Sequence, residues 1–159
     1  MRRIPAIITS VLMLFSLSAC GKGSSAVDYL SIPFSSEARI VIDSSEYLVH
    51  IEKGGADLIS VVVGYPEDIR GMSVSLGEES GVSFRNAKIL QGFPRSVAQL
   101  IYDAFEPSYI TETFSDGDAE IVRFTSPHGG GNIRIDGFSC VPISLDSEGI
   151  HIEFTDFKR

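Results

Sequence analysis

Hydrophobic and polar residues alternate along most of the chain, from about residue 38 to the end. The alternating stretches lie around residues 40–42, 47–52, 72–76, 82–85, 109–114, 120–125, 133–135, 141–145 and 150–154. A period of two is typical of a strand with one dry and one wet face. Residues 58–63 form a more continuous apolar run, interrupted only by Ser60, which favours a strand covered on both faces. We therefore predict about nine or ten strands.

Turn residues separate these stretches at short intervals. Gly54-Gly55 and Asp116-Gly117 are hairpin dipeptides. Further turns are expected at residues 43–45 and 146–149. The segment 66–71, which begins with proline, continues with acids and ends with glycine, predicts a single helical turn.

One segment has the period of a helix. Between Pro94 and Glu106, apolar residues recur at i, i+3, i+4, i+7 and i+8, namely Val97, Leu100, Ile101, Ala104 and Phe105. Pro94 suits a first turn, and Pro107 ends the helix. We expect this stripe to pack on one face of the sheet, which gives an α+β fold: a meandering antiparallel sheet wrapped around one main helix.

The first twenty residues have a different pattern. Arg2 and Arg3 precede an apolar run of about 14 residues, shorter than the roughly 20 that span a bilayer. The run ends at Leu17-Ser18-Ala19-Cys20. Positive residues, a short apolar core and small residues at a cleavage site predict a signal peptide over residues 1–19.

The cysteine at the cleavage site changes this interpretation. Leu17-Ser18-Ala19-Cys20 resembles the bacterial lipobox, in which the thiol receives a diacylglyceryl group before cleavage. We predict lipidation, including palmitate-type chains, at Cys20, which holds the protein at the extracytoplasmic face of the membrane. Residues 20–33 then form a lipidated, flexible tether and residues 34–159 the folded domain; an ordinary secretory signal is the alternative.

Charge and size limit the class of protein. Cleavage removes two of 13 basic side chains and leaves 11 against 21 acidic ones, a formal balance of −10. Such a surface repels nucleic acid and anionic headgroups, so the lipid must provide the anchor. The remaining 140 residues suit one domain with a proper core.

Candidate chemistry is sparse. Cys140 is expected to be a buried hydrophobe in an apolar strand, since acylation of Cys20 would leave it without a disulfide partner. The histidines His50, His128 and His151 lack the spacing of metal ligands and are expected at the surface. We predict no metal site and no cofactor.

Two further patterns were considered for catalysis. Ser126-Pro127-His128 followed by three glycines could be a nucleophile or a phosphate loop, but a strand is expected from about Asn132, where a phosphate loop needs a helix. The glycines are expected to form a flexible hairpin loop. The acid pairs 78–79 and 116/118 lie in predicted turns, where nothing raises a carboxyl pKa. We predict no catalytic residue.

The lipobox, the successive hairpins, the turn at 66–71, the mid-chain helix and the final Ile152-Glu153-Phe154-Thr155-Asp156-Phe157 strand together resemble LolA/LolB-like lipoproteins. More narrowly, residues 34–159 look like the small germination lipoproteins of the GerS type in spore-forming bacteria. The resemblance implies a strongly curved, unclosed antiparallel sheet with helices over its concave side. It also implies either acyl-chain binding in the concavity or binding to a cortex-modifying amidase. The chain is shorter than the transport members and lacks tryptophan.

Three functions are compatible with these features. The first is a non-catalytic, membrane-anchored binding or scaffold module for a protein of the cell envelope. The second is a carrier or receptor for acyl chains or lipoproteins, with a hydrophobic ligand between helix and sheet. The third is a hydrolase of wall polymers, for which His128 is the best candidate residue.

Overall fold

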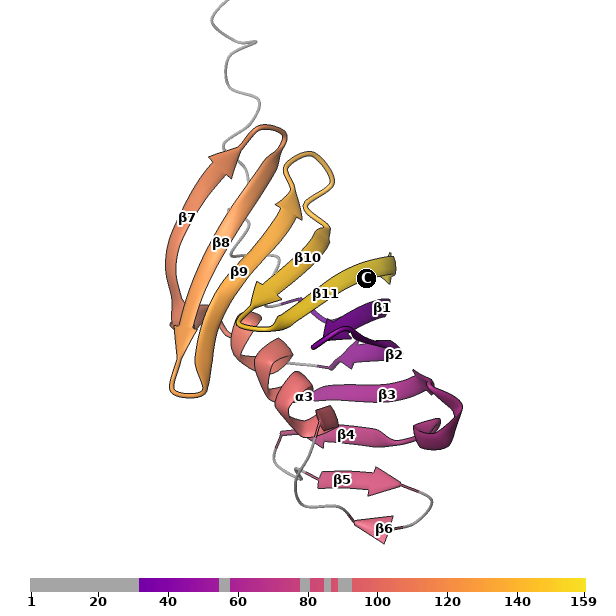
Figure 1. The fold of residues 1–159 in the computed structure, drawn as a ribbon. Coiled ribbons are helices and arrows are strands. Elements are labelled where there is room, and N and C mark those ends of the chain that lie inside the picture. Colours follow the sequence, from indigo (N-terminus) through magenta and orange to yellow (C-terminus); the bar gives the residue numbers. More distant parts are fainter. Residues whose placement is uncertain (1–31, 55–57, 78–80, 85–86, 89–92) are drawn as a thin grey trace, which may run out of the picture.

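Eleven strands of the described part of the chain form one antiparallel sheet (Figure 1). The computed structural model describes residues 32–54, 58–77, 81–84, 87–88 and 93–159, and only the backbone of those between 81 and 95. Residues 1–31, which include the predicted signal peptide and Cys20, lie outside the described residues. The strands are β1 (Phe34–Ile42), β2 (Ser45–Lys53), β3 (Ile59–Tyr65), β4 (Ser73–Leu76), β5 (Gly81–Phe84), β6 (Ala87–Lys88), β7 (Ile110–Asp116), β8 (Ala119–Ser126), β9 (Gly129–Asp136), β10 (Pro142–Ser147) and β11 (Ile150–Lys158).

The sheet joins two meanders through the first and last strands. The order is β6-β5-β4-β3-β2-β1-β11-β10-β9-β8-β7, so β1 and β11 pair in the interior of the sheet, while β6 and β7 form its two edges. The register places Ile40 of β1 opposite Ile152 of β11 and Tyr47 of β2. Because the two edges do not meet, the sheet is unclosed, as the resemblance implied.

Tight turns connect most neighbouring strands, as predicted. Asp43 and Ser44 both have positive φ, of 46° and 71°, in a two-residue turn between β1 and β2. Gly117, with φ of 62°, and Gly149, with φ of 71°, occupy the corresponding turns of the β7-β8 and β10-β11 hairpins. The predicted helical turn is the short 3-10 helix η1 (Glu67–Ile69), and Gly71 follows it with φ of 80°.

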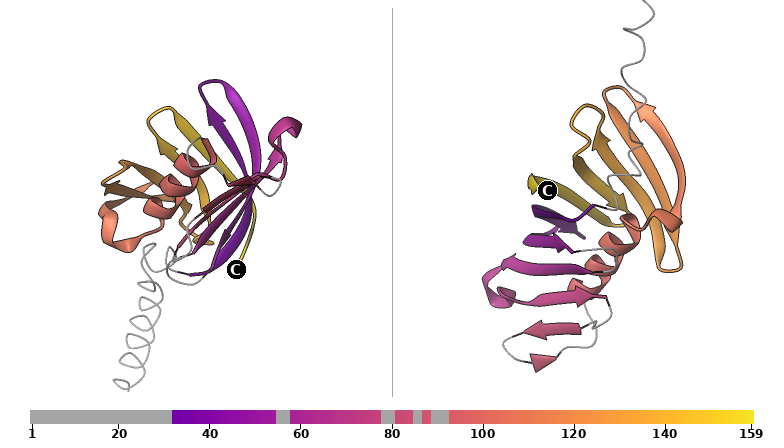
Figure 2. Two further views of the ribbon diagram at one scale, coloured as in Figure 1. Left: turned by 90° about the horizontal axis from the view of Figure 1, so that it is seen from below. Right: turned by 180° about the vertical axis from the view of Figure 1, so that it is seen from behind.

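The predicted helix is α3 (Phe93–Ala104), which begins one residue earlier and ends two residues earlier than expected. A second 3-10 helix, η2 (Pro107–Tyr109), follows it. Five residues on successive turns of this segment are buried, namely Val97, Ala98, Ile101, Ala104 and Phe105. The helix lies on the concave side of the sheet and contacts β3 and β4 in one half and β8 and β9 in the other (Figure 2). The α+β prediction of a curved sheet around one main helix is confirmed.

An aromatic cluster fixes the end of this helical segment to the centre of the sheet. The ring of Phe105 lies 4.9 Å from that of Phe34 on β1 and 6.0 Å, edge to face, from that of Phe154 on β11. Phe34 also stacks on Phe157 at 4.7 Å. Burial of each such side chain contributes about 1.5–3 kcal/mol. Packed apolar side chains therefore connect this end of the helical segment to the central strands of the sheet.

Three sequence predictions need correction. Strand β3 is covered on one face only: Val61 and Val63 are buried, whereas Val62 is half-buried and faces the convex side. Its apolar run reflects β-branched preference as well as burial. The two-residue β6 was not predicted, because two residues carry no periodicity. The glycines expected in a loop begin strand β9, and the turn before it is at residues 127–128.

Close backbone contact explains those strand glycines. A Cβ atom on Gly131 would lie 2.3 Å from the carbonyl oxygen of Asp146 and 3.0 Å from the ring of Phe124. A Cβ on Gly130 would lie 2.9 Å from the carbonyl oxygen of Phe124. The glycine run thus allows β8, β9 and β10 to approach closely rather than providing a flexible loop.

Candidate functional site

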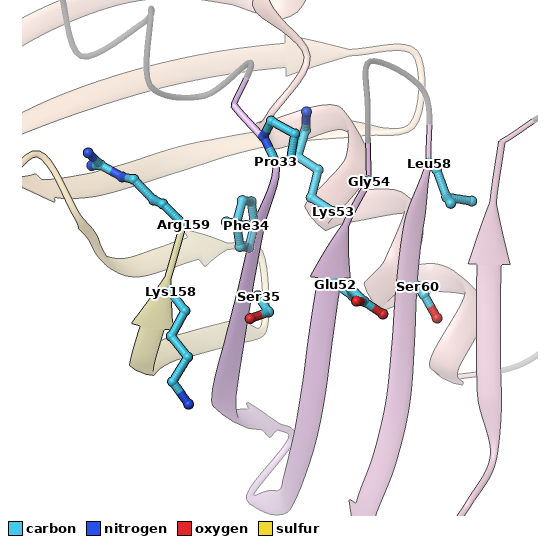
Figure 3. Close-up of a pocket in the computed structure, with 10 residues that line it drawn as sticks. All are labelled: Pro33, Phe34, Ser35, Glu52, Lys53, Gly54, Leu58, Ser60, Lys158 and Arg159. Atoms are coloured by element: carbon cyan, nitrogen blue, oxygen red, sulfur yellow. The ribbon is translucent and has the colours of Figure 1, made fainter.

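A groove opens at the end of the sheet where β1 begins (Figure 3). It encloses about 500 Å³, and four of its residues occupy one row across neighbouring strands. The register places Lys158 of β11 opposite Ser35, Ser35 opposite Glu52, and Glu52 opposite Ser60. Among the described residues, the lining consists of Pro33, Phe34, Ser35, Glu52, Lys53, Gly54, Leu58, Ser60, Lys158 and Arg159.

Cationic side chains border this groove in an otherwise acidic protein. Lys158 donates to Asp156 at 2.7 Å, and this hydrogen bond, followed by the carboxylate charge, raises the pKa of the Lys158 ammonium. The guanidinium of Arg159 donates to the carbonyl oxygens of Ser139 and Cys140, at 3.4 Å and 2.6 Å. The groove therefore combines an apolar wall with a charged border, in which the cationic side chains of Lys53, Lys158 and Arg159 outnumber the carboxylate of Glu52. Such a lining suits a ligand with an acidic and an apolar part.

Apolar side chains are also exposed beside the groove. Ile32 and Leu58 are 39% and 49% exposed, and Phe138, in the turn between β9 and β10, is 99% exposed. Asp136 accepts hydrogen bonds from the backbone N–H groups of Phe138 and Ser139, which fixes this turn. Exposed apolar residues of this size at one end of a domain are typical of a binding surface. No pattern in the sequence indicates this surface, because alternation identifies strand faces and not strand ends.

A second site surrounds Asp103 on α3, a residue that the sequence analysis did not select. Asp103 is 1% exposed, and its Oδ1 accepts from Gln99 Nε2 at 2.9 Å. Its Oδ2 accepts from Ser126 Oγ at 2.6 Å and lies 3.0 Å from Nδ1 of His128. The one available sequence signal was the spacing of Gln99 and Asp103, four residues apart on one helix face.

The Asp103 cluster brings together the predicted candidates Ser126 and His128, but not as a catalytic triad. In a triad the serine hydroxyl bonds to the imidazole, and the imidazole bonds to the carboxylate. Here the Ser126 hydroxyl donates to Asp103, and it accepts from the backbone N–H of His128 at 3.1 Å. Two donors, Ser126 and His128, tie the β8-β9 turn to the buried carboxylate on α3, and Gln99 of the same helix is its third donor.

The side chains of all three histidines are exposed at the surface, as expected. His50 Nδ1 lies 2.9 Å from Glu37 Oε1, and His151 Nδ1 lies 2.6 Å from Asp146 Oδ1, both on the convex side. Within the described ranges no group of three or more His, Cys, Asp or Glu side chains could hold a metal ion.

The prediction that Cys140 lies within an apolar strand is wrong. This residue is half-buried in the turn between β9 and β10, with a free thiol and φ of 55°. Its apolar flanks, Phe138 and Val141, gave the impression of a strand. Of the two acid pairs, residues 78–79 lie outside the described residues, whereas Asp116 is exposed at the β7-β8 hairpin, as predicted, and pairs with Arg134 at 2.8 Å.

The comparisons with known proteins find similarity only among solved structures. No family model matches the sequence, and no curated protein matches it. The chain is similar to the LolA superfamily protein NE2245 from Nitrosomonas europaea, with 13% identity and a TM-score of 0.46 over 84% of this chain and 90% of that one. It is likewise similar to a DUF1329 family protein from Desulfovibrio piger, with 12% identity and a TM-score of 0.46 over 83% and 88%.

A chain of the Pseudomonas aeruginosa MucA/MucB complex is also similar, with 12% identity and a TM-score of 0.42 over 85% of this chain and 57% of that one. Identities of 12–13% and TM-scores below 0.5 assign this chain to no family and carry no residue roles over to it. Across the described part of the chain, no helix has the length and apolarity to cross a membrane.

Proposed function

We propose that this protein is a membrane-anchored, extracytoplasmic lipoprotein whose domain binds a protein partner in the cell envelope without catalysing a reaction. The observation that carries the proposal is Leu17-Ser18-Ala19-Cys20, with β1 beginning at Phe34, fourteen residues after the cysteine. A flexible tether of this length spans roughly 20 Å. The domain would therefore work close to the membrane surface.

The end of the sheet where β1 begins supports the binding role. Pro33, which immediately precedes β1, lines the groove, and Lys158 and Arg159 provide its cationic border. A partner that docks here would lie between the domain and the membrane. An envelope amidase, the partner class implied by the resemblance to GerS-type lipoproteins, is the first candidate.

The anchor is tested by metabolic labelling with palmitate. The wild-type protein should carry the label and sediment with membranes, whereas Cys20→Ser should be unlabelled and soluble after extraction. Unlabelled wild-type protein, or membrane retention of Cys20→Ser equal to that of wild type, would contradict lipid anchoring.

The partner is tested by a cross-linked pull-down of the lipidated protein from its own membranes, read by mass spectrometry. Lys158→Glu reverses one charge in the groove, and Arg70→Glu, at η1, is the matched control outside it. A stoichiometric envelope protein that is retained by wild type and Arg70→Glu but lost from Lys158→Glu would support docking at the groove. Absence of a retained protein from all three would refute the scaffold role.

A carrier for acyl chains is the second candidate, favoured by the apolar interior beneath α3. Ile101 and Phe105 of this helical segment are wholly buried against the sheet, so an acyl chain would enter only if α3 moved. Addition of oleate should then accelerate amide hydrogen exchange in α3, and native mass spectrometry should detect the bound lipid. Unchanged exchange together with absence of bound lipid would exclude this role.

A further inference from the structure

Strand β7 forms one long, exposed edge of the sheet (Figure 1). It is the last strand in the order and pairs with β8 on one side; on its other side no described strand lies. All its residues from Thr111 to Asp116 are exposed. An edge of this kind presents unpaired backbone N–H and C=O groups, which another extended chain can bind.

The usual means of protecting an edge strand are missing from most of β7. The strand contains no lysine and no proline. Its register shift lies between Ile110 and Glu112, so the pairing from Glu112 to Asp116 is regular over five consecutive residues. Bulges, prolines and outward charges are what prevent pairing at natural sheet edges. The regular part of β7 thus remains a suitable template for an added strand.

The two acids of β7 are held by arginines of the same sheet. Glu112 pairs with Arg123 of β8, and Asp116 pairs with Arg134 of β9 at 2.8 Å. These ion pairs direct both carboxylates along the convex face, toward the interior strands and away from the open edge. Neither charge therefore blocks an approaching backbone.

The convex face of β7 also offers an apolar contact. Phe114 is 39% exposed, its register partner on β8 is Ile121, and the guanidinium of Arg123 lies 5.5 Å from its ring centre. The ring is therefore held in place beside the edge. An apolar side chain of an added strand would pack against it in the manner of a cross-strand pair.

We propose that β7 binds an extended, basic segment of the partner protein by strand addition, with an apolar residue of that segment packed on Phe114. The inference rests on the proposed function, whose partner it specifies. The hairpin from Ile110 to Ser126 has four acids, at positions 112, 116, 118 and 120, and one base, Arg123. When Arg134 of β9, which pairs with Asp116, is also counted, two acids remain in excess. This excess of acids favours a basic segment and opposes pairing of two β7 edges from two copies of the acidic chain.

The first test uses a synthetic peptide with the sequence acetyl-Lys-Val-Lys-Val-Lys-Val-Thr-amide and the mature lipidated protein in detergent. The peptide should bind in a fluorescence-anisotropy titration and slow amide hydrogen exchange in β7. Ser115→Lys, at the edge, should weaken binding at least tenfold, whereas the matched variant Thr125→Lys, on the interior strand β8, should change it less than twofold.

Two controls separate strand addition from other modes of binding. The same peptide methylated on the backbone nitrogens of one edge keeps its charge but loses those hydrogen bonds, and it should fail to bind. Equal binding of both peptides, or equal weakening by both lysine variants, would overturn the inference. Protection of β7 without peptide, together with a doubled mass in light scattering, would identify a second copy as the occupant and would also overturn it.

The pull-down from native membranes distinguishes failure of this inference from failure of the proposed function. A partner retained by wild type and Thr125→Lys but lost from Ser115→Lys is the expected result. Equal retention by all three proteins would refute binding at β7 and leave the scaffold function intact. Retention by none of them would refute the scaffold function itself.

Discussion

Replacement of Asp103 by alanine should destabilise the domain strongly, although Asp103 lies outside the apolar stripe of α3. The carboxylate is 1% exposed and accepts from Gln99, Ser126 and His128. The Asp103→Ala variant leaves these donors without their acceptor. It also removes the polar connection between α3 and the β8-β9 turn.

The magnitude follows from the burial of the three donors. Gln99 and Ser126 are partly buried, and a hydrogen bond to a charged group contributes about 1.5–3 kcal/mol. His128 has a side chain that is 57% exposed, so its contact contributes at most about 1 kcal/mol. Asp103→Ala should therefore lower the free energy of unfolding by at least about 3 kcal/mol, the lower end of these contributions, which corresponds to roughly 12 °C or more in Tm for a domain of this size.

Urea denaturation followed by circular dichroism measures this loss. Glu112→Ala, which breaks an exposed ion pair with Arg123, is the matched control and should cost less than about 1 kcal/mol. The Asp103→Asn variant keeps the side-chain volume but has one acceptor atom. Its loss in the free energy of unfolding should lie between those of Asp103→Ala and Glu112→Ala. A double-mutant cycle of Asp103→Ala and Ser126→Ala should give a coupling energy of about 1–2 kcal/mol.

An equal loss for Asp103→Ala and Glu112→Ala would refute the reasoning. It would mean that the buried carboxylate is not the connection between helix and hairpin. Since Ser126 and His128 were also the candidates for catalysis, a large stability loss on Asp103→Ala would show that their arrangement is needed for folding.

Three further predictions concern packing and titration. Gly131→Ala should lower the free energy of unfolding by about 2 kcal/mol in urea melts, because the added Cβ would clash with the carbonyl oxygen of Asp146 on β10. Gly64→Ala is the control and should have little effect, because its Cβ would lie at an ordinary 3.5 Å from the carbonyl oxygen of Leu48. The backbone N–H of Ser139, and after it the Ser139 hydroxyl, hold the pKa of Asp136 below its ordinary value. The resulting stabilisation of the fold is present above the pKa of Asp136 in the unfolded chain and is lost as the pH falls through its pKa in the folded chain. Carbon-detected NMR titration should show a higher Asp136 pKa in Ser139→Ala, and an unchanged pKa would contradict this assignment. Phe105→Ala should cost about 3–5 kcal/mol in the same melts, and a loss below 1 kcal/mol would show that the aromatic cluster is not a close-packed core.

Local signals in the sequence predicted most of the fold. The period-two stretches became strands, the proline-flanked stripe became α3, and Gly117 and Gly149 occupy left-handed turn positions. These features depend on a few neighbouring residues, for which steric and burial preferences are strong. The curvature of the sheet around the helix agreed with the family resemblance.

Features that depend on distant residues were not predictable. The pairing of β1 with β11 joins segments more than a hundred residues apart, and no local pattern encodes it. The position of Asp103 against Ser126 likewise requires α3 to cross to the β8-β9 half of the sheet. The groove at the start of β1 needs four strand ends to come together. Each is a product of tertiary packing rather than of sequence periodicity.

The central position of the first and last strands sets the order in which this chain can complete its fold. The meander from β1 to β6 and the meander from β7 to β11 become one sheet only when β11 pairs with β1, which brings Ile152 opposite Ile40. A chain that is still being synthesised, without residues 150–158, has an unpaired edge in what becomes the middle of its sheet. Completion of the domain must wait for the last strand, so a truncation there should leave a chain that is exposed to proteases and unable to reach the native state.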